Sequence, residues 1–90
     1  MGRWYVYLLR CSDNSLYCGI TTDLKRRVQE HSAGIGSRYT RSRRPVRLVW
    51  SFGALRRTEA NREEFRIKRM SKQAKEILVA DGPVRKIGSR

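Results

Sequence analysis

Two short runs of apolar and aromatic side chains lie near the start of the chain, with a polar turn between them. Residues 3–11 and 16–20 are rich in aromatic and β-branched types, so both runs are predicted to be β-strands. The Ser-Asp-Asn-Ser cluster at 12–15 favours a tight turn, because Asp and Asn hydrogen-bond their own backbone. The pattern predicts an antiparallel hairpin with Tyr5 and Tyr7 on one face of its first strand.

After the hairpin the apolar pattern takes a helical period. Thr22 or Asp23 is suited to cap the start of a helix that runs to about residue 32, and Gly34 is suited to end it. Four side chains then recur at the spacing i, i+3, i+4 and i+7, which places them on one face of that helix. They are Leu24, Arg27, Val28 and His31.

The rest of the chain is predicted to hold one long loop, one strand and two further helices. Residues 34–45 are polar and rich in glycine and arginine, and a loop of this length in a compact domain is a functional candidate. Residues 46–52 alternate as a third strand would. The two helices are predicted over 59–70, capped by Thr58, and over 72–80, opened by Ser71.

This order, β-β-α-β-α-α, predicts an α+β fold in which helices flank a small three-stranded antiparallel sheet. The chain has 90 residues, of which 39% are hydrophobic, and this suffices for one modest core. We therefore expect one domain over residues 1–83. Residues 84–90 are expected to form a flexible basic tail.

The net charge of the chain indicates which kind of molecule it binds. The chain carries 21 Lys and Arg against 8 Asp and Glu, a net charge of +13. A surplus this large indicates a polyanionic partner, with nucleic acid first and an anionic membrane surface second. Neither a long apolar stretch nor a strongly amphipathic basic helix supports the membrane. No membrane contact and no obligate protein partner are inferred.

The cysteines and the N-terminal residues bear on the cellular compartment. No signal peptide is recognised, so we expect a cytoplasmic protein in which Cys11 and Cys18 are free thiols. Two cysteines and one histidine without CxxC spacing do not predict a zinc site.

An ordered set of polar side chains carries the strongest functional signal. The triplets Tyr5-Val6-Tyr7 and Tyr17-Cys18-Gly19 precede a helix with Arg27 and His31 one turn apart, and Glu64 lies on a later helix. Over nearly the whole chain this set resembles the GIY-YIG endonucleases, and in particular their small single-domain bacterial branch.

The sequence also departs from the family pattern. Tyr5 replaces the first glycine, Ile20 stands where some repair-type relatives have lysine, and the late asparagine of larger members has no counterpart. These departures concern the subfamily and the reaction rate more than membership of the family.

The resemblance implies a catalytic role for four residues of the first half. Tyr17 would be the general base or would orient the attacking water, and Tyr7 could share that role, so the base stays open between them. Arg27 would clamp the scissile phosphate with its planar guanidinium. His31 suits proton transfer or a hydrogen bond to phosphate. The structural alternatives are a packed tyrosine, a solvated arginine and a buried histidine with satisfied hydrogen bonds.

Glu64 is the expected metal ligand, by resemblance to the family's second helix. It would bind one divalent cation, Mg²⁺ or Mn²⁺, since Mg²⁺ takes few protein ligands and keeps several waters. Glu63 is the neighbouring rival, and the structural alternative for Glu64 is an ion pair along the helix.

Further side chains are expected to support the site or to bind nucleic acid. Gly19 would let the backbone turn out of its strand beside the site. The arginine-rich loop, with one tyrosine to stack a base, could follow a nucleic-acid backbone, or it could be an ordinary solvated loop. The residues expected to bind nucleic acid are Lys25, Arg26, Arg38, Tyr39, Arg41, Arg43, Arg44 and Lys68.

Together these features predict a metal-dependent DNA endonuclease. The resemblance implies products that carry a 5′ phosphate. A small domain cannot cover a long recognition sequence, so we expect weak sequence preference and single-stranded, flapped or otherwise distorted DNA as substrate; RNA stays open. The pathway (repair, uptake, recombination or defence) is not determined by the sequence.

Two alternatives belong to other classes of protein. A DNA- or RNA-binding module that keeps the fold without the chemistry would bind without needing a metal. A small structural or partner-binding protein would associate with little dependence on salt.

Overall fold

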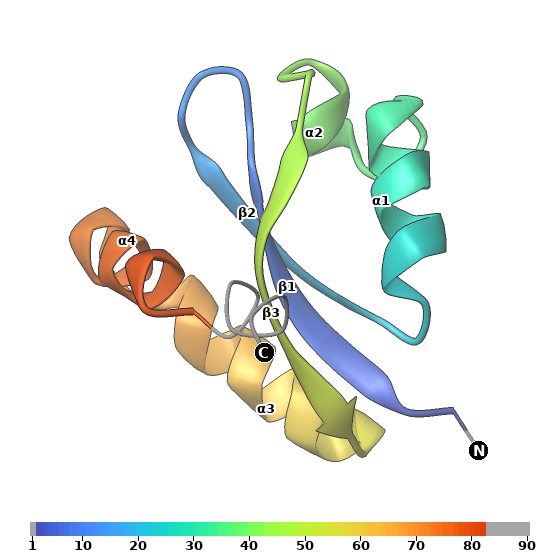
Figure 1. Ribbon diagram of the computed structural model, residues 1–90, viewed down its shortest axis with the longest axis vertical. Helices are drawn as coiled ribbons and strands as arrows, with labels where there is room; N and C mark the ends of the chain where they lie inside the picture. Colours follow the sequence, from blue (N-terminus) through green and yellow to red (C-terminus); the bar gives the residue numbers. More distant parts are fainter. Residues whose placement is uncertain (1, 83–90) are drawn as a thin grey trace.

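The computed structural model describes residues 2–82 as a three-stranded sheet between two pairs of helices (Figure 1). The predicted α+β class is confirmed, and the predicted tail at 84–90 lies outside the described residues. The elements in chain order are β1 (Trp4–Arg10), β2 (Leu16–Thr21), α1 (Leu24–Ser32), α2 (Arg38–Arg41), β3 (Arg47–Leu55), α3 (Arg57–Lys68) and α4 (Lys72–Ala80).

The sheet has the order β2-β1-β3, and both of its pairings are antiparallel. The predicted hairpin pairs Tyr7 with Gly19 and Leu9 with Tyr17. β1 is central, so both of its edges are hydrogen-bonded and both of its faces are available for packing. Tyr7 therefore sits in the middle of the sheet, beside the glycine of the second triplet.

The alternation along β1 divides the core into two clusters. Val6 and Leu8 face α3 and α4, where they pack with Trp50 and Ile67. Tyr7 and the other side chains of the opposite face form the second cluster, which α1 covers. Burial on both faces explains why β1 is a nearly continuous apolar run. The second cluster comprises Tyr7, Leu9, Cys11 and Val46, with Tyr17, Leu24, Val28 and Leu48 packed against it.

α1 begins and ends close to where the sequence predicts. The Asp23 side chain accepts a hydrogen bond from the Arg26 amide, as an N-cap does. Gly34 has φ = 86°, a left-handed conformation that glycine adopts without strain and that ends the helix. The stripe from Leu24 to His31 faces the sheet, with His31 fully buried.

Three boundaries differ from the predictions. Residues 38–41 of the expected loop form the short helix α2, because the Ser37 side chain caps the Thr40 amide. β3 runs on to Leu55, since its pairing with β1 continues to Trp4. α3 starts at residue 57, before the predicted Thr58 cap, because the Glu59 carboxylate accepts a hydrogen bond from the backbone amide of Arg56. The same helix ends at residue 68 rather than at the predicted residue 70.

Other predictions agree with the structure. Ser71 caps α4, and its hydroxyl accepts from the Ala74 amide. Cys11 and Cys18 are both free and buried, and they belong to different core clusters. No helix within residues 2–82 is both long and apolar enough to cross a membrane.

Candidate active site

The buried centre of the candidate site is a hydrogen bond between a tyrosine and a histidine. The Tyr7 hydroxyl lies 2.9 Å from Nε2 of His31. Tyr7 is 1% exposed and His31 is fully buried. β1 contributes the tyrosine, and the last turn of α1 contributes the histidine. Two of the residues predicted to be catalytic are therefore in direct contact, although 24 positions separate them.

The chain of hydrogen bonds continues beyond the histidine into α2. Nδ1 of His31 lies 2.8 Å from the Thr40 hydroxyl, which in turn lies 2.9 Å from the Ser37 hydroxyl. Both ring nitrogens are thus engaged, and Thr40 is fully buried. A neutral imidazole has one donor and one acceptor nitrogen, and because each hydroxyl can donate or accept, the pair of contacts suits either tautomer.

Neither Thr40 nor Ser37 was among the site residues predicted from the sequence. The Ser-x-x-Thr spacing from 37 to 40 could have indicated a helix start. The surrounding arginines instead led to the prediction of a loop. That Thr40 bonds to His31 follows only from the packing of α2 against α1.

Burial shifts both proton equilibria of the tyrosine–histidine pair toward the neutral forms. It raises the pKa of Tyr7 to about 12, and the neighbouring Arg27 guanidinium opposes part of this rise. The pKa of His31 is lowered, first by burial and then by Arg27, whereas Glu30 opposes the change. Near neutral pH, Tyr7 is therefore protonated and His31 uncharged.

Arg27 is held beside this pair by two hydrogen bonds. One guanidinium nitrogen bonds to Glu30 at 2.8 Å, and the other bonds to the carbonyl oxygen of Gly36 at 3.0 Å. Its side chain is half-buried rather than fully solvated. A fixed, partly exposed guanidinium next to a tyrosine hydroxyl can bind a phosphate oxygen without first losing much side-chain entropy.

Tyr17 lies on the same face of the sheet but at its β2 edge. Its ring centroid is 5.2 Å from that of His31 and 5.7 Å from that of Tyr39. Tyr17 is half-buried, so it is more accessible than Tyr7. The Tyr39 ring packs on Tyr17 and has the Arg43 guanidinium 3.8 Å over its centroid, but Tyr39 stays exposed, at 37%, so its role in binding nucleic acid stays a prediction.

Two glycines leave room for the ring atoms of the site. A Cβ atom on Gly19 would lie 2.4 Å from the Tyr7 hydroxyl oxygen, and one on Gly36 would lie 2.4 Å from Nδ1 of His31. The prediction for Gly19 is thus corrected in its reason: the residue remains within β2, and close approach of Tyr7 requires the glycine.

Glu64 comes from α3, on the other side of the sheet. Its negative charge contributes to raising the pKa of Cys18 in β2, after burial, so the carboxylate lies near that strand. Oε2 of Glu64 is 3.1 Å from Nζ of Lys68, whose charge also interacts with Tyr17. Glu63, the rival metal ligand, is instead paired with Arg66 at 2.7 Å.

The donor set around Glu64 fits a divalent cation that keeps most of its water. Within residues 2–82, no three His, Cys, Asp or Glu side chains gather to enclose a metal. Glu64 could provide one carboxylate, and phosphate oxygens and water would complete an octahedral Mg²⁺ shell. The Lys68 ammonium would have to move aside, because it pairs with that carboxylate.

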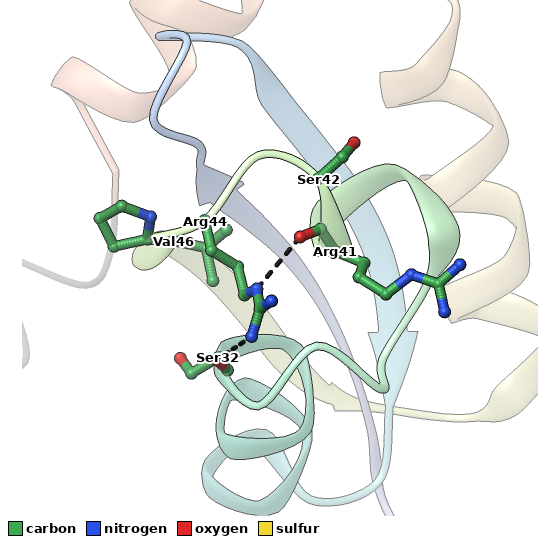
Figure 2. A pocket seen from close by; sticks show the side chains of 6 residues that line it. Ser32, Arg41, Ser42, Arg44 and Val46 are labelled. Atoms are coloured by element: carbon green, nitrogen blue, oxygen red, sulfur yellow. Dashed lines mark hydrogen bonds between the residues drawn. The ribbon is translucent and has the colours of Figure 1, made fainter.

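The residues predicted to bind nucleic acid are mostly exposed, but several already make hydrogen bonds or ion pairs within the protein. Arg44 donates to the carbonyl oxygens of Ser32 and Arg41 and lines a shallow pocket of about 390 Å³ (Figure 2). Figure 2 shows the Arg41 side chain directed away from Arg44. Arg43 pairs with Asp13 at 3.0 Å. Lys25, Arg26 and Arg38 are exposed on α1 and α2, and Lys68 is exposed on α3.

Comparison with known proteins agrees with this geometry. The GIY-YIG catalytic domain matches residues 3–76. The UPF0213 protein of Vibrio cholerae is 50% identical over 78 residues, which are 86% of this chain and 77% of the relative. The UPF0213 protein YhbQ of Escherichia coli is 45% identical over 82 residues, covering 91% of this chain and 82% of the relative.

A solved structure is also similar. The solution NMR structure of the UPF0213 protein BH0048 from Bacillus halodurans is 44% identical, with a TM-score of 0.58, and the match covers 91% of this chain and 89% of that one. Nucleases with this domain generally use a divalent metal. The predicted family is confirmed: this chain belongs to the GIY-YIG nuclease family and is similar to its small bacterial members.

Proposed function

We propose that this protein is a metal-dependent endonuclease that hydrolyses DNA phosphodiester bonds. The observation that carries the proposal is the hydrogen bond between Tyr7 and His31 beside the Arg27 guanidinium. A proton acceptor and a phosphate-binding cation thus lie together in a chain of net charge +13. General acid–base catalysis and charge stabilisation are the two contributions that phosphoryl transfer most needs from a protein.

In this proposal Arg27 binds the scissile phosphate, and the more exposed Tyr17 orients the attacking water. The water oxygen attacks phosphorus while its proton passes to Tyr7, whose own proton passes to Nε2 of His31. The bond from phosphorus to the 3′ oxygen breaks, and the 3′ oxygen takes a proton from solvent water, so the products are a 3′ hydroxyl and a 5′ phosphate. In this proposal the Nδ1–H of His31 donates to the Thr40 hydroxyl, 2.8 Å away, which leaves Nε2 as the acceptor of this proton. The proposal moves the base from Tyr17 to the Tyr7–His31 pair.

Glu64 would hold the divalent cation, Mg²⁺ or Mn²⁺. When bound, the cation supplies positive charge that offsets the charge growing on the phosphate and the leaving oxygen. Without the cation, Lys68 pairs with the Glu64 carboxylate; once the cation is bound, the Lys68 ammonium could contact a phosphate instead.

We also propose a substrate class. The basic side chains are spread over α1, α2 and α3, so binding would rely on phosphate contacts and would fall steeply with salt. Single-stranded, flapped or otherwise distorted DNA fits best, with weak sequence preference, and RNA is the competing substrate. The protein would act in the cytoplasm, where its free thiols stay reduced.

A second candidate function is binding of nucleic acid without cleavage. The Glu64–Lys68 ion pair favours it, because a lysine already satisfies the carboxylate that would hold the metal. In that case, binding would not depend on Mg²⁺, and Glu64 would have no role beyond α3.

The test is cleavage of end-labelled single-stranded, double-stranded and flapped DNA, and of a matched RNA, with Mg²⁺, Mn²⁺ or chelator. Wild type is compared with Glu64→Gln and with Glu63→Gln as the matched control on the same helix. We expect metal-dependent cutting that Glu64→Gln abolishes without loss of binding and that Glu63→Gln retains. Tight binding without cutting under every condition would favour the second candidate, and cutting by Glu64→Gln at the wild-type rate would overturn the metal site.

A further inference from the structure

The outward face of α3 carries a large exposed aromatic ring among arginines. Phe65 is 64% exposed, although most large apolar side chains of this chain are in the core. It lines a shallow depression of about 400 Å³ together with Met70 and three arginines. The arginines are Arg62, Arg66 and Arg69.

Helical spacing explains why these side chains gather. Arg62, Phe65, Arg66 and Arg69 follow the i, i+3, i+4, i+7 pattern, so they share one face. Ala60 and Ile67, on the opposite face, are fully buried against the sheet. The solvent face of α3 therefore carries a phenylalanine that belongs to neither core cluster.

The contacts within this face leave the ring and most of the positive charge available. The Arg69 guanidinium lies 5.3 Å from the ring centroid of Phe65, and Arg66 is paired with Glu63. Arg62 and Arg69 are both exposed. Apart from Glu63, the side chains of this face are basic or apolar.

We propose that this face, comprising Arg62, Phe65, Arg66, Arg69 and Met70, binds an unpaired nucleotide whose base stacks on Phe65 and whose phosphates contact Arg62 and Arg69. Charge complementarity selects this occupant, since exposed arginines around an apolar ring match a polyanion that also presents flat aromatic surfaces. A single strand offers both groups, whereas the bases of an intact duplex are stacked and hidden.

This inference rests on the proposed function, and it gives a reason for the preference for single-stranded or flapped DNA. Phe65 and Glu64 belong to the same helix but point about 100° apart around its axis, so a strand held on this face would have to pass around α3 to reach the proposed metal site. The aromatic expected to stack a base, Tyr39, has its ring packed on Tyr17 and under Arg43. At 64% exposure, Phe65 is more open to a base than Tyr39, at 37%.

The test measures binding of short oligonucleotides at low salt in chelator, so that cleavage has no influence. Wild type and Phe65→Ala are compared on a single-stranded thymidine oligomer and on the same oligomer with abasic sites. We expect Phe65→Ala to weaken binding about five- to tenfold on the normal oligomer and to have little effect on the abasic one. Phe65→Trp should retain binding.

Ile77→Ala is the control, because Ile77 is a comparably exposed apolar residue, at 58%, on α4. It should bind both oligomers as wild type does. If wild type binds and Phe65→Ala binds equally well, the stacking site is overturned while the proposed nuclease stands. If Phe65→Ala is weakened equally on both oligomers, no base stacks there and the proposal is likewise overturned. If wild type binds no oligomer, the proposed function itself fails.

Discussion

The Tyr7–His31–Thr40 chain comes from β1, α1 and α2, whereas the Glu64–Lys68 pair comes from α3 near the β2 edge, and the two differ in how firmly the fold holds them. The first is buried, and each polar atom of the histidine ring has a partner within 2.9 Å. The second is partly exposed and consists of one ion pair along a helix, with Glu64 at 23% exposure. The buried chain keeps its geometry without substrate, whereas the exposed pair can rearrange when a cation or a phosphate arrives.

The largest expected effect is on the buried side, with Tyr7→Phe. Loss of the hydroxyl removes the proposed proton acceptor, so cleavage should slow by about 10²- to 10⁴-fold. The variant also leaves Nε2 of His31 unpaired, which should lower the free energy of unfolding by about 1–3 kcal/mol. Single-turnover cleavage and urea unfolding measure the two effects.

Tyr17→Phe is the matched variant at the edge of the sheet. Its unfolding free energy should change by less than about 0.5 kcal/mol, because Tyr17 is only half-buried and its ring can stay stacked on Tyr39. If Tyr17→Phe slowed cleavage more than Tyr7→Phe does, the role of general base would be assigned to Tyr17 and not to the Tyr7–His31 pair.

Gly19→Ala tests whether the position of Tyr7 depends on the space beside it. A Cβ atom would lie 2.4 Å from the hydroxyl oxygen, and the buried ring has no open space into which to move. We expect a loss of about 1–3 kcal/mol in unfolding free energy, as for other overpacked sites, and slower cleavage. Gly2→Ala, whose added Cβ atom would meet only ordinary contacts from 3.4 Å, serves as the control and should leave both unchanged.

Thr40→Val tests whether the far end of the buried chain orients the histidine. The substitution keeps the shape but leaves Nδ1 of His31 without a partner, so we expect a loss of about 1–3 kcal/mol in stability. Thr40→Ser keeps a hydroxyl and should restore most of the stability and of the cleavage rate. Equal behaviour of the two variants would mean that Thr40 contributes only packing.

The pH dependence gives a smaller effect with a definite sign. In the unfolded chain His31 titrates near its ordinary pKa of about 6.5, whereas burial and Arg27 lower the pKa in the folded chain. At a pH between the folded and the unfolded pKa, the unfolded chain binds more protons than the folded chain. The free energy of unfolding is therefore highest above a pH of about 6.5 and falls as the pH drops from there toward the folded pKa.

His31 is the only histidine, so its ring resonances in NMR report this titration without ambiguity. We expect an apparent pKa below 6.5 and an acid limb of cleavage in the same range. An apparent pKa above 6.5 would contradict the burial that the structure describes.

The smallest expected effect is on the exposed side, with Lys68→Met. Removal of the ammonium frees Glu64, so the affinity for Mg²⁺ should rise, by up to about fivefold for an ion pair of this exposure. Binding of Mn²⁺, followed by water relaxation, measures the affinity independently of activity. Unchanged Mn²⁺ binding, with Glu63→Gln as the reference variant, would show that Lys68 does not compete for the carboxylate.

The sequence by itself determined the class of fold, the order of the longer elements and the family. Local signals suffice for these: the aromatic and apolar run at residues 3–11, a stripe of period 3.6 over residues 24–31, and capping by Asp23 and Ser71. Such patterns act between residues that are close in the chain, so they can be recognised without a structure.

Tertiary structure decided which of the candidate residues touch. The contacts of His31 with Tyr7 and Thr40 need the sheet, α1 and α2 to be packed together, and no local pattern encodes that distance. Packing also stacks the Tyr39 ring between Tyr17 and Arg43 and leaves Phe65 the more exposed of the two, at 64% against 37%. Residue type states what a side chain can do, but burial and neighbours, which depend on the whole fold, decide whether it is available to do it.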